Sequence, residues 1–317
     1  MSPPPAPPGR CAVLLQTHFY NPSLARVFRK LKAECPPGYD AFVLLHTPSR
    51  KGIPARLERE RHHVALTAEC RLPAYGRKAG IDAEGRMVPG WSVRDDGHSD
   101  LMPLHFHARH PEYDYYWIIE YDVRISGSWT RFLQHFESSA ADLLTTTVRS
   151  GAEHPNWLYW DTLRTPPAVP PLAPEDRLCC FLPVYRLSRS AMQAIDLAYR
   201  QGWAGHAEVT LPTILRQAGL TVEDLGSDGH FVRADNRGRW YSNAPQDLAG
   251  TAGSFVAAPP RFVIGRQPDM LWHPVKPLGP MLMDKLRKIP ARLRGLLPRL
   301  GVGRRRALAA EQPKLPG

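Results

Sequence analysis

The chain has 317 residues, 43% of them hydrophobic, and a formal net charge of +11 at pH 7. A chain of this size can bury a substantial core, either as one large α/β domain or as two smaller domains. It has no stretch of the roughly 18 uninterrupted apolar residues that a membrane span requires. Residues 1–9 lack the charged start and apolar run of a secretory signal peptide, and we expect them to form a disordered, proline-rich leader.

The five cysteines show no spacing typical of a metal site. An odd number of cysteines in a chain without a secretion signal favours reduced thiols and a cytoplasmic location.

The first half of the chain begins with a β-α-β pattern. Residues 11–17 form an apolar run typical of a strand, residues 22–34 place apolar side chains on one helical face, and residues 41–46 form a second apolar run. This order predicts a parallel pair of strands joined by a right-handed crossover. Residues 50–100 are polar and aperiodic and predict no definite element, whereas residues 101–110 predict a helix.

The second half predicts further strands and helices. In chain order, these are a helix at 129–136 after a turn at 126–128, a strand at 142–148, a strand at 181–185, a helix capped by Ser188 that ends near residue 200, a helix at 208–218 and a short strand at 220–225. The proline-rich segment 165–174 predicts an extended loop. The simplest arrangement is one α/β domain, residues 10–278, with a mostly parallel central sheet flanked by helices.

Residues 279–317 form a tail that carries most of the net positive charge, with nine Lys or Arg residues between Lys285 and Arg306. The charge therefore says little about the ligand of the remaining chain. Leucine and isoleucine recur in the tail at three- or four-residue steps, which is the pattern of a helix on an anionic membrane surface. Pro290 and Pro298 would break or kink such a helix, so a disordered basic tail is the alternative.

Two carboxylates at the end of a strand form the main candidate site. Residues 115–119 are all aromatic or β-branched, as in a strand buried on both faces of a parallel sheet, and Glu120 and Asp122 follow at a spacing of i, i+2. Ligands bind beyond the carboxyl ends of such strands. Two acids there can hold a divalent cation against a diphosphate. The alternative is a strand end whose acids meet water or a neighbouring arginine such as Arg124.

Two other acid–base candidates lie later in the chain. Glu208 falls in the first turn of a predicted helix, where a carboxylate either stabilises the helix N-terminus or removes a proton from an acceptor hydroxyl as a general base. His206 would assist it or make a structural hydrogen bond. His273 by itself does not indicate a functional site. Beside a metal at Glu120 and Asp122, it would complete a mixed oxygen and nitrogen ligand set.

Several common motifs are absent from the sequence, namely G-x-G-x-x-G, the P-loop, G-x-S-x-G and H-E-x-x-H. Their absence disfavours NAD enzymes, P-loop kinases, serine hydrolases and zincins. The histidines at 62–63 and 105–110 lack the further ligands of a structural zinc site. The aromatic residues at 157–160 either line an acceptor pocket or form a small hydrophobic cluster under the long loop.

With these segments in this order, the chain resembles glycosyltransferases of the GT-A fold, which use nucleotide-sugar donors. The resemblance covers roughly residues 10–277, and it is narrower to an uncharacterised bacterial group with a Tyr-Trp-x-x-Glu-Tyr-Asp-Val core. Glu120 and Asp122 stand in place of the family's Asp-x-Asp motif, with Glu replacing the first Asp. Glu208 stands where the family often has the acid that activates the acceptor, although Val209 replaces the second acid of many relatives.

The resemblance implies a transferase that moves a hexosyl or N-acetylhexosaminyl group from a nucleotide-sugar to a hydroxyl of a glycan or lipid-linked acceptor. It implies that Mn²⁺ or Mg²⁺ is held by Glu120, Asp122 and His273, where a late metal-binding histidine is common in the family. Glu208 would act as the base, with inversion at the sugar carbon.

The nucleotide would be contacted by residues 14–20, including Thr17 and His18. Some transferases of this fold need no metal and stabilise the leaving diphosphate with basic side chains, and Arg186 and Lys276 are the candidates for that role here. Peripheral attachment to the inner face of the membrane through the tail would suit a lipid-linked acceptor.

Two other functions remain open from the sequence. A nucleotidyltransferase would use the same acids on a metal-bound triphosphate and release pyrophosphate. A nucleic-acid-binding protein would use the basic tail and lose affinity steeply with salt. This function leaves the strand that ends in Glu120 and Asp122 without a role, so we disfavour nucleic acid as a partner.

Overall fold

The computed structural model describes residues 9–51, 53–243 and 253–276. All of these residues fall within one compact unit, Met1–Lys276. The basic tail and nearly all of the proline-rich leader lie outside the described residues, so the expectations for them stay predictions.

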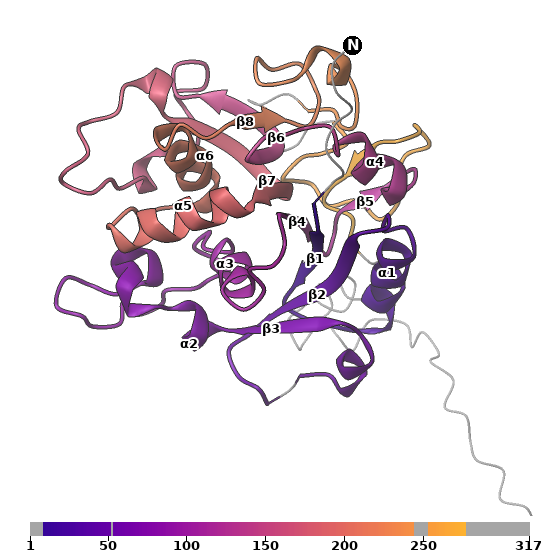
Figure 1. The fold of residues 1–317 in the computed structure, drawn as a ribbon, viewed down its shortest axis with the longest axis horizontal. Coiled ribbons are helices and arrows are strands. Elements are labelled where there is room, and N and C mark those ends of the chain that lie inside the picture. Colours follow the sequence, from indigo (N-terminus) through magenta and orange to yellow (C-terminus); the bar gives the residue numbers. More distant parts are fainter. Residues whose placement is uncertain (1–8, 52, 244–252, 277–317) are drawn as a thin grey trace, which may run out of the picture. The chain divides into compact units, whose positions relative to one another are not determined.

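A seven-stranded sheet forms the centre of the unit, in the order β3-β2-β1-β4-β7-β6-β8 (Figure 1). The strands are β1 (Cys11–Thr17), β2 (Tyr39–Thr47), β3 (His62–Leu66), β4 (Tyr115–Glu120), β6 (Leu143–Ser150), β7 (Leu178–Ser188) and β8 (Val222–Asp224). The pairs β1–β2, β1–β4, β2–β3 and β6–β8 are parallel. Strand β7 is antiparallel to both β4 and β6. The predicted mostly parallel sheet is therefore confirmed, with β7 as its one reversed strand.

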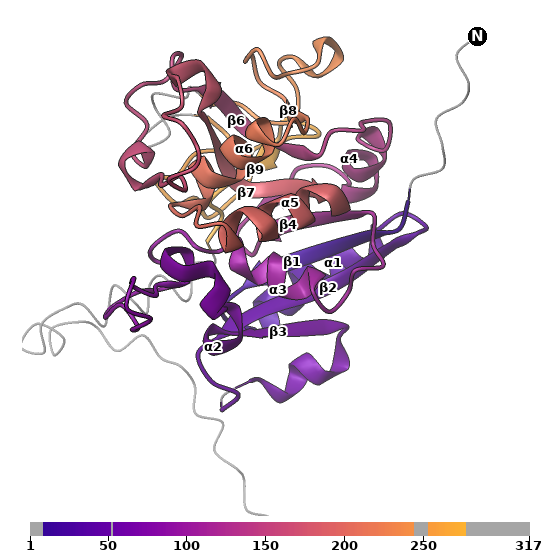
Figure 2. The same ribbon diagram turned by 60° about the vertical axis from the view of Figure 1, so that its left-hand side comes forward.

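Helices cover both faces of this sheet (Figures 1 and 2). They are α1 (Pro22–Ala33), α2 (Thr67–Cys70), α3 (Leu101–His107), α4 (Trp129–His135), α5 (Arg189–Arg200) and α6 (Ala207–Gln217). Short 3₁₀ helices lie at Ala55–Arg59, Pro73–Ala79, Trp160–Thr162, Pro174–Asp176 and Ala234–Asn236.

Side chains of β1 alternate between two hydrophobic clusters, as expected for a strand buried on both faces. Ala12 and Leu14 pack in the cluster that contains the apolar faces of α3, α5 and α6. Val13 and Leu15 pack in the cluster that contains those of α1 and α4. The apolar run that predicted this strand therefore reflects a helix layer on each side of the sheet.

Local capping fixes where three of the helices begin. The Asn21 side chain accepts a hydrogen bond from the backbone N of Leu24 at 2.9 Å and starts α1. Ser128 and Ser188 cap α4 and α5 in the same way, through the backbone N of Thr130 and of Ala191. The predicted starts at the 126–128 turn and at Ser188 are confirmed.

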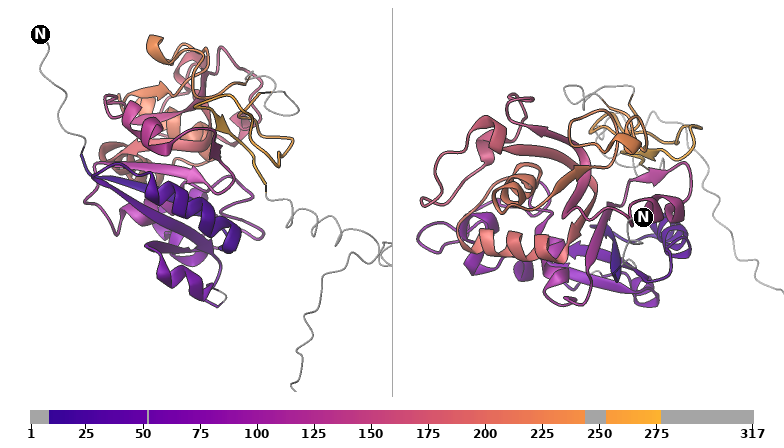
Figure 3. Two further views of the ribbon diagram at one scale, coloured as in Figure 1. Left: turned by 90° about the vertical axis from the view of Figure 1, so that its right-hand side faces the viewer. Right: turned by 45° about the horizontal axis from the view of Figure 1, so that its top comes forward.

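The C-terminal end of the described chain returns to the strand that carries the two acids. A second, two-stranded sheet pairs β5 (Arg124–Ile125) antiparallel with β9 (Leu271–Trp272) (Figure 3). The backbone N of Val275 donates to the carbonyl oxygen of Asp122 at 2.8 Å. These contacts, which the sequence did not predict, bring residues 271–276 beside the loop after β4. No helix among the described residues is long and apolar enough to cross a membrane.

Candidate functional site

The candidate site is a pocket of about 610 Å³ at the carboxyl ends of β1 and β4. The chain leaves β1 toward β2 on one side, and β4 lies on the other side of β1. This is the point where the strand order reverses, and it is where open α/β sheets bind ligands. The pocket is lined by Gln16, Thr17 and His18 at the end of β1, and by Glu120, Tyr121 and Asp122 at the end of β4.

Glu120 is the last residue of β4, and its side chain is half-buried, whereas Asp122 is only 2% exposed. The neighbouring Arg124 does not neutralise them directly, because its Nη1 donates to the carbonyl oxygens of Tyr121 and Val123 at 2.8 and 2.7 Å. Oδ1 of Asp122 is buried and has no hydrogen-bond partner among the described residues. A buried acceptor of this kind is costly unless a cation or a proton donor meets it.

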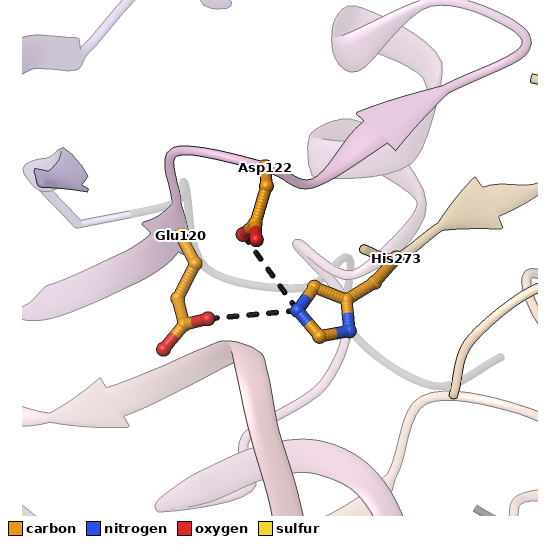
Figure 4. Close-up of side chains that lie close together, drawn as sticks. All are labelled: Glu120, Asp122 and His273. Atoms are coloured by element: carbon orange, nitrogen blue, oxygen red, sulfur yellow. Dashed lines mark ion pairs between the residues drawn. The ribbon is translucent and has the colours of Figure 1, made fainter. Parts of the chain in front are cut away.

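His273 faces both acids (Figure 4). Its Nε2 lies 3.6 Å from Oδ1 of Asp122 and 3.7 Å from Oε2 of Glu120. Its Nδ1 lies 2.8 Å from the carbonyl oxygen of Val256. A carbonyl only accepts, so Nδ1 carries a proton and donates it to Val256. Nε2 is the ring nitrogen that faces the two carboxylates and would be the metal-binding atom.

Three acceptor groups therefore converge, with ligand atoms within 4.8 Å of one another. Two carboxylate oxygens and one imidazole nitrogen suit a divalent cation such as Mn²⁺. The hydrogen bond from Nδ1 to a carbonyl is the outer contact that commonly orients a metal-binding histidine. The three residues that the sequence singled out as ligands fit a cation.

A fixed positive charge lies on the other side of Asp122. Nζ of Lys276 contacts Oδ2 of Asp122 and donates to the hydroxyl of Tyr121 at 2.6 Å. Burial alone lowers the pKa of Lys276, but the charge of Asp122 and the hydrogen bonds hold that pKa above its usual value. Lys276 is thus charged in the pocket, where the sequence predicted a diphosphate-binding group.

Glu208 approaches the pocket from the first turn of α6. It is not the N-cap of that helix, because Nδ1 of His206 accepts the hydrogen bond from the backbone N of Glu208 at 3.2 Å. Burial, and secondarily the negative charge of Glu120, raise the pKa of Glu208 to about 8. An acid with a pKa near the working pH is suited to proton transfer.

The start of α6 is held by a buried ion pair beneath it. Nζ of Lys78 lies 2.9 Å from Oδ1 of Asp100 and donates to the carbonyl oxygen of Gly205 at 2.9 Å, and both side chains are almost fully buried. The Tyr199 hydroxyl donates to the other carboxylate oxygen of Asp100. Because a buried network of this kind is rigid when its members are paired, it fixes the backbone just before His206 and Glu208.

The aromatic residues near position 160 make two kinds of contact. Tyr159 lines the pocket and stacks on His206, with ring centroids 3.6 Å apart and an interplanar angle of 2°. Trp157 belongs to a small hydrophobic cluster with Cys179, and both Tyr159 and Trp160 pack against this cluster. Both sequence interpretations therefore apply, and Tyr159 takes part in both.

The structure brings seven of the predicted site residues together and leaves one out. Those at the pocket are Thr17, His18, Glu120, Asp122, Glu208, His273 and Lys276. Arg186 is not at the pocket. Its guanidinium donates to the carbonyl oxygens of Phe136, Ser139 and Ala141 and lies over the ring of Tyr115.

Sequence reasoning missed other polar residues of the pocket. Arg94 and Asp95 line it from the segment that showed no periodicity, and His46 lines it from the end of β2. Gln16 also lines the pocket, and it lies within the segment 14–20 that was expected to contact the nucleotide. No sequence signal pointed to Arg94.

Comparison with known proteins adds one partial match. A family described as a protein of unknown function (DUF3405) matches residues 84–142, a stretch that includes β4 and both of its carboxylates. No curated protein matches the chain.

We predict that Arg186→Met destabilises the fold without weakening ligand binding. The substitution leaves three carbonyl oxygens without their donor, and each unpaired buried group costs about 1–3 kcal/mol. Urea unfolding should show a loss of about 3 kcal/mol or more. Arg131→Met is the matched control, because Arg131 is exposed and its ion pair with Asp269 lies at the surface, so the loss in this variant should stay below about 1 kcal/mol. Equal stabilities of the two variants would contradict the structural role of Arg186.

Proposed function

We propose that the protein is a glycosyltransferase of the GT-A type that transfers a sugar from a nucleotide-sugar to a hydroxyl acceptor. The observation that carries the proposal is the convergence of Glu120, Asp122 and His273 in the pocket that also contains Glu208. One end of this pocket suits a diphosphate with its cation, and the other offers a base. The resemblance in the order of the sequence motifs supports the same conclusion.

The diphosphate of the donor fits the end of the pocket near Asp122. A divalent cation held by Glu120, Asp122 and His273 would stabilise the negative charge that develops on the leaving nucleoside diphosphate. Lys276 adds a fixed positive charge at the same carboxylate, and Arg94 adds another at the pocket wall. The nucleotide would lie against Thr17 and His18 after β1.

Glu208 is the group that would accept the proton of the acceptor hydroxyl. The acceptor oxygen forms a bond to the anomeric carbon, the bond from that carbon to the diphosphate oxygen breaks, and the proton passes to the Glu208 carboxylate. A base on the face opposite the leaving group gives inversion. The flat stack of Tyr159 on His206 offers an apolar face on which a sugar ring can rest.

A thermal-shift screen of nucleoside diphosphates, with and without Mn²⁺, tests the substrate class. A ligand at about 100 times its dissociation constant adds about 2.7 kcal/mol to the stability of the folded state. Product analysis then decides the reaction, since a glycosyltransferase releases a nucleoside diphosphate and a nucleotidyltransferase releases pyrophosphate. The proposal fails if no nucleoside diphosphate raises the melting temperature under either condition.

We predict that the cation affinity depends on His273. Titration calorimetry with Mn²⁺ should show a loss of more than about tenfold for His273→Ala and for Asp122→Asn, since each removes a ligand atom. His62→Ala is the matched control, because His62 lies on β3 and bonds to the carbonyl oxygen of Glu60. Wild-type affinity in His273→Ala would remove the cation from the proposal.

We predict that Glu208→Gln lowers turnover by about 10²–10⁴-fold, because a general base is lost. In the wild type the Glu208 carboxyl is protonated below its pKa of about 8 and ionised above it. Turnover by a base should therefore rise with pH through this range, and a cation at Glu120 should move the rise to lower pH.

Glu223→Gln is the control for this pH profile. Burial also raises the pKa of Glu223, but its carboxylate accepts from Ser139 at 2.9 Å and lies on β8, outside the pocket. Its variant should keep the wild-type profile. A Glu208→Gln enzyme with the same profile and rate as the wild type would leave Glu208 a structural role only.

A further inference from the structure

Three consecutive apolar side chains stand out on the surface of the described residues. Phe262, Val263 and Ile264 are 44%, 76% and 39% exposed. We propose that these three residues, the apolar tip, insert into the surface of an anionic lipid bilayer. The proposal does not depend on the transferase activity.

The base of the apolar tip is held in place on both sides. Before the tip, the backbone N of Arg261 donates to the carbonyl oxygen of Pro274, and the backbone N of Lys276 donates to that of Arg261, both at 2.8 Å. After it, Gly265 passes so close to Trp272 that an added Cβ would lie 2.1 Å from a ring carbon. The backbone therefore holds the tip outward from a fixed base.

Contiguous apolar exposure of this kind is unusual on a protein that meets only water. Other exposed large hydrophobic residues of the described chain are single or paired, namely Leu72, Met87, Val88, Leu158 and Leu197. Single exposed apolar residues are ordinary and need no explanation. Three consecutive exposed apolar residues, by contrast, require an explanation.

Charge indicates which surface the tip meets. Exposed Arg266 follows the tip, and the chain continues from Lys276, beside the base of the tip, into the sequence that holds nine Lys or Arg residues between Lys285 and Arg306. Apolar residues next to basic ones match a bilayer that carries anionic headgroups. A second copy of the chain, with its own net charge of +11, would bring repulsion instead.

The tip is also close to the pocket along the chain, because Ala257 and Pro260, just before the tip, line the pocket. Contact of the tip with a bilayer would therefore bring the pocket near the membrane surface. If the proposed sugar transfer holds, this position suits an acceptor anchored in the membrane. That last step rests on the proposed function, whereas the bilayer contact does not.

Vesicle co-sedimentation of the full chain, without nucleotide or metal, tests the contact. We expect the wild type to pellet with vesicles of phosphatidylcholine and phosphatidylglycerol and to stay in solution with phosphatidylcholine alone. The triple variant Phe262→Ser, Val263→Ser, Ile264→Ser should lose at least about tenfold in affinity for the anionic vesicles. The matched control Met87→Ser, Val88→Ser removes an exposed apolar pair elsewhere and should bind as the wild type does.

A second measurement reads the tip directly. Val263→Cys labelled with a polarity-sensitive fluorophore should shift to shorter wavelength on adding anionic vesicles, and the same label at Met87→Cys should not. Wild-type protein treated with the same fluorophore measures the background fluorescence from labelling of the native cysteines.

Three outcomes would overturn the inference. The first is a triple variant that pellets as well as the wild type, which would assign all membrane binding to other residues. The second is an unshifted label at Val263→Cys in the presence of bound vesicles. The third is a wild-type dimer in the absence of lipid that the triple substitution turns into a monomer, which would make the tip a contact between copies.

Discussion

A buried carboxylate needs positive charge beside it, and this need organises the pocket. Asp122 is almost fully buried at the end of β4, where an unpaired carboxylate would cost several kcal/mol. Lys276 supplies that charge, and His273 faces the same carboxylate. Both residues come from the far end of the described chain. The β5–β9 pair and the hydrogen bond from Val275 to Asp122 hold that end in place. The site therefore exists only when both parts of the chain are folded against each other.

The two ends of the pocket are coupled through charge. The carboxylate of Glu120 helps to raise the pKa of Glu208, and Glu120 is also one of the three groups that converge on the cation position. A positive charge at that position offsets the effect of Glu120, so it makes the ionised form of Glu208 more favourable. In the proposed transferase, binding of the cation and diphosphate would therefore favour the ionised form of Glu208 without any movement of the backbone.

Local sequence patterns predicted most of the central sheet and its helices. The apolar runs at β1, β2 and β4, the caps at Ser128 and Ser188, and the acids after β4 are all set by residues close together in the sequence. These features follow from periodicity and capping, which act over a few residues. The candidate ligands Glu120 and Asp122 belong to this class, since a strand end places them without reference to the rest of the chain.

What the sequence left unpredicted depends on distant partners. Strand β3 is short and half polar, so its alternation is visible only once β2 lies beside it. The reversed direction of β7 is a property of the topology rather than of its residues. Arg186 shows the same limit, because its role is decided by carbonyl groups at residues 136–141, which the fold brings against it. A basic residue in an apolar strand gives no local sign of whether it faces a ligand or the backbone.

The C-terminal end of the described chain connects the pocket to the surface. Arg261 is hydrogen-bonded to Pro274 and Lys276, and the backbone N of Val256 donates to the carbonyl oxygen of His273. The ring of His273 is in turn oriented by the carbonyl oxygen of Val256. The backbone that carries His273, the proposed cation ligand, and Lys276 is thus hydrogen-bonded to the backbone at the base of the apolar tip. Because these hydrogen bonds join the segment before the tip to residues 273–276, a shift at the tip and a shift of His273 or Lys276 are not independent. Whatever holds the tip therefore also restrains the geometry around Asp122.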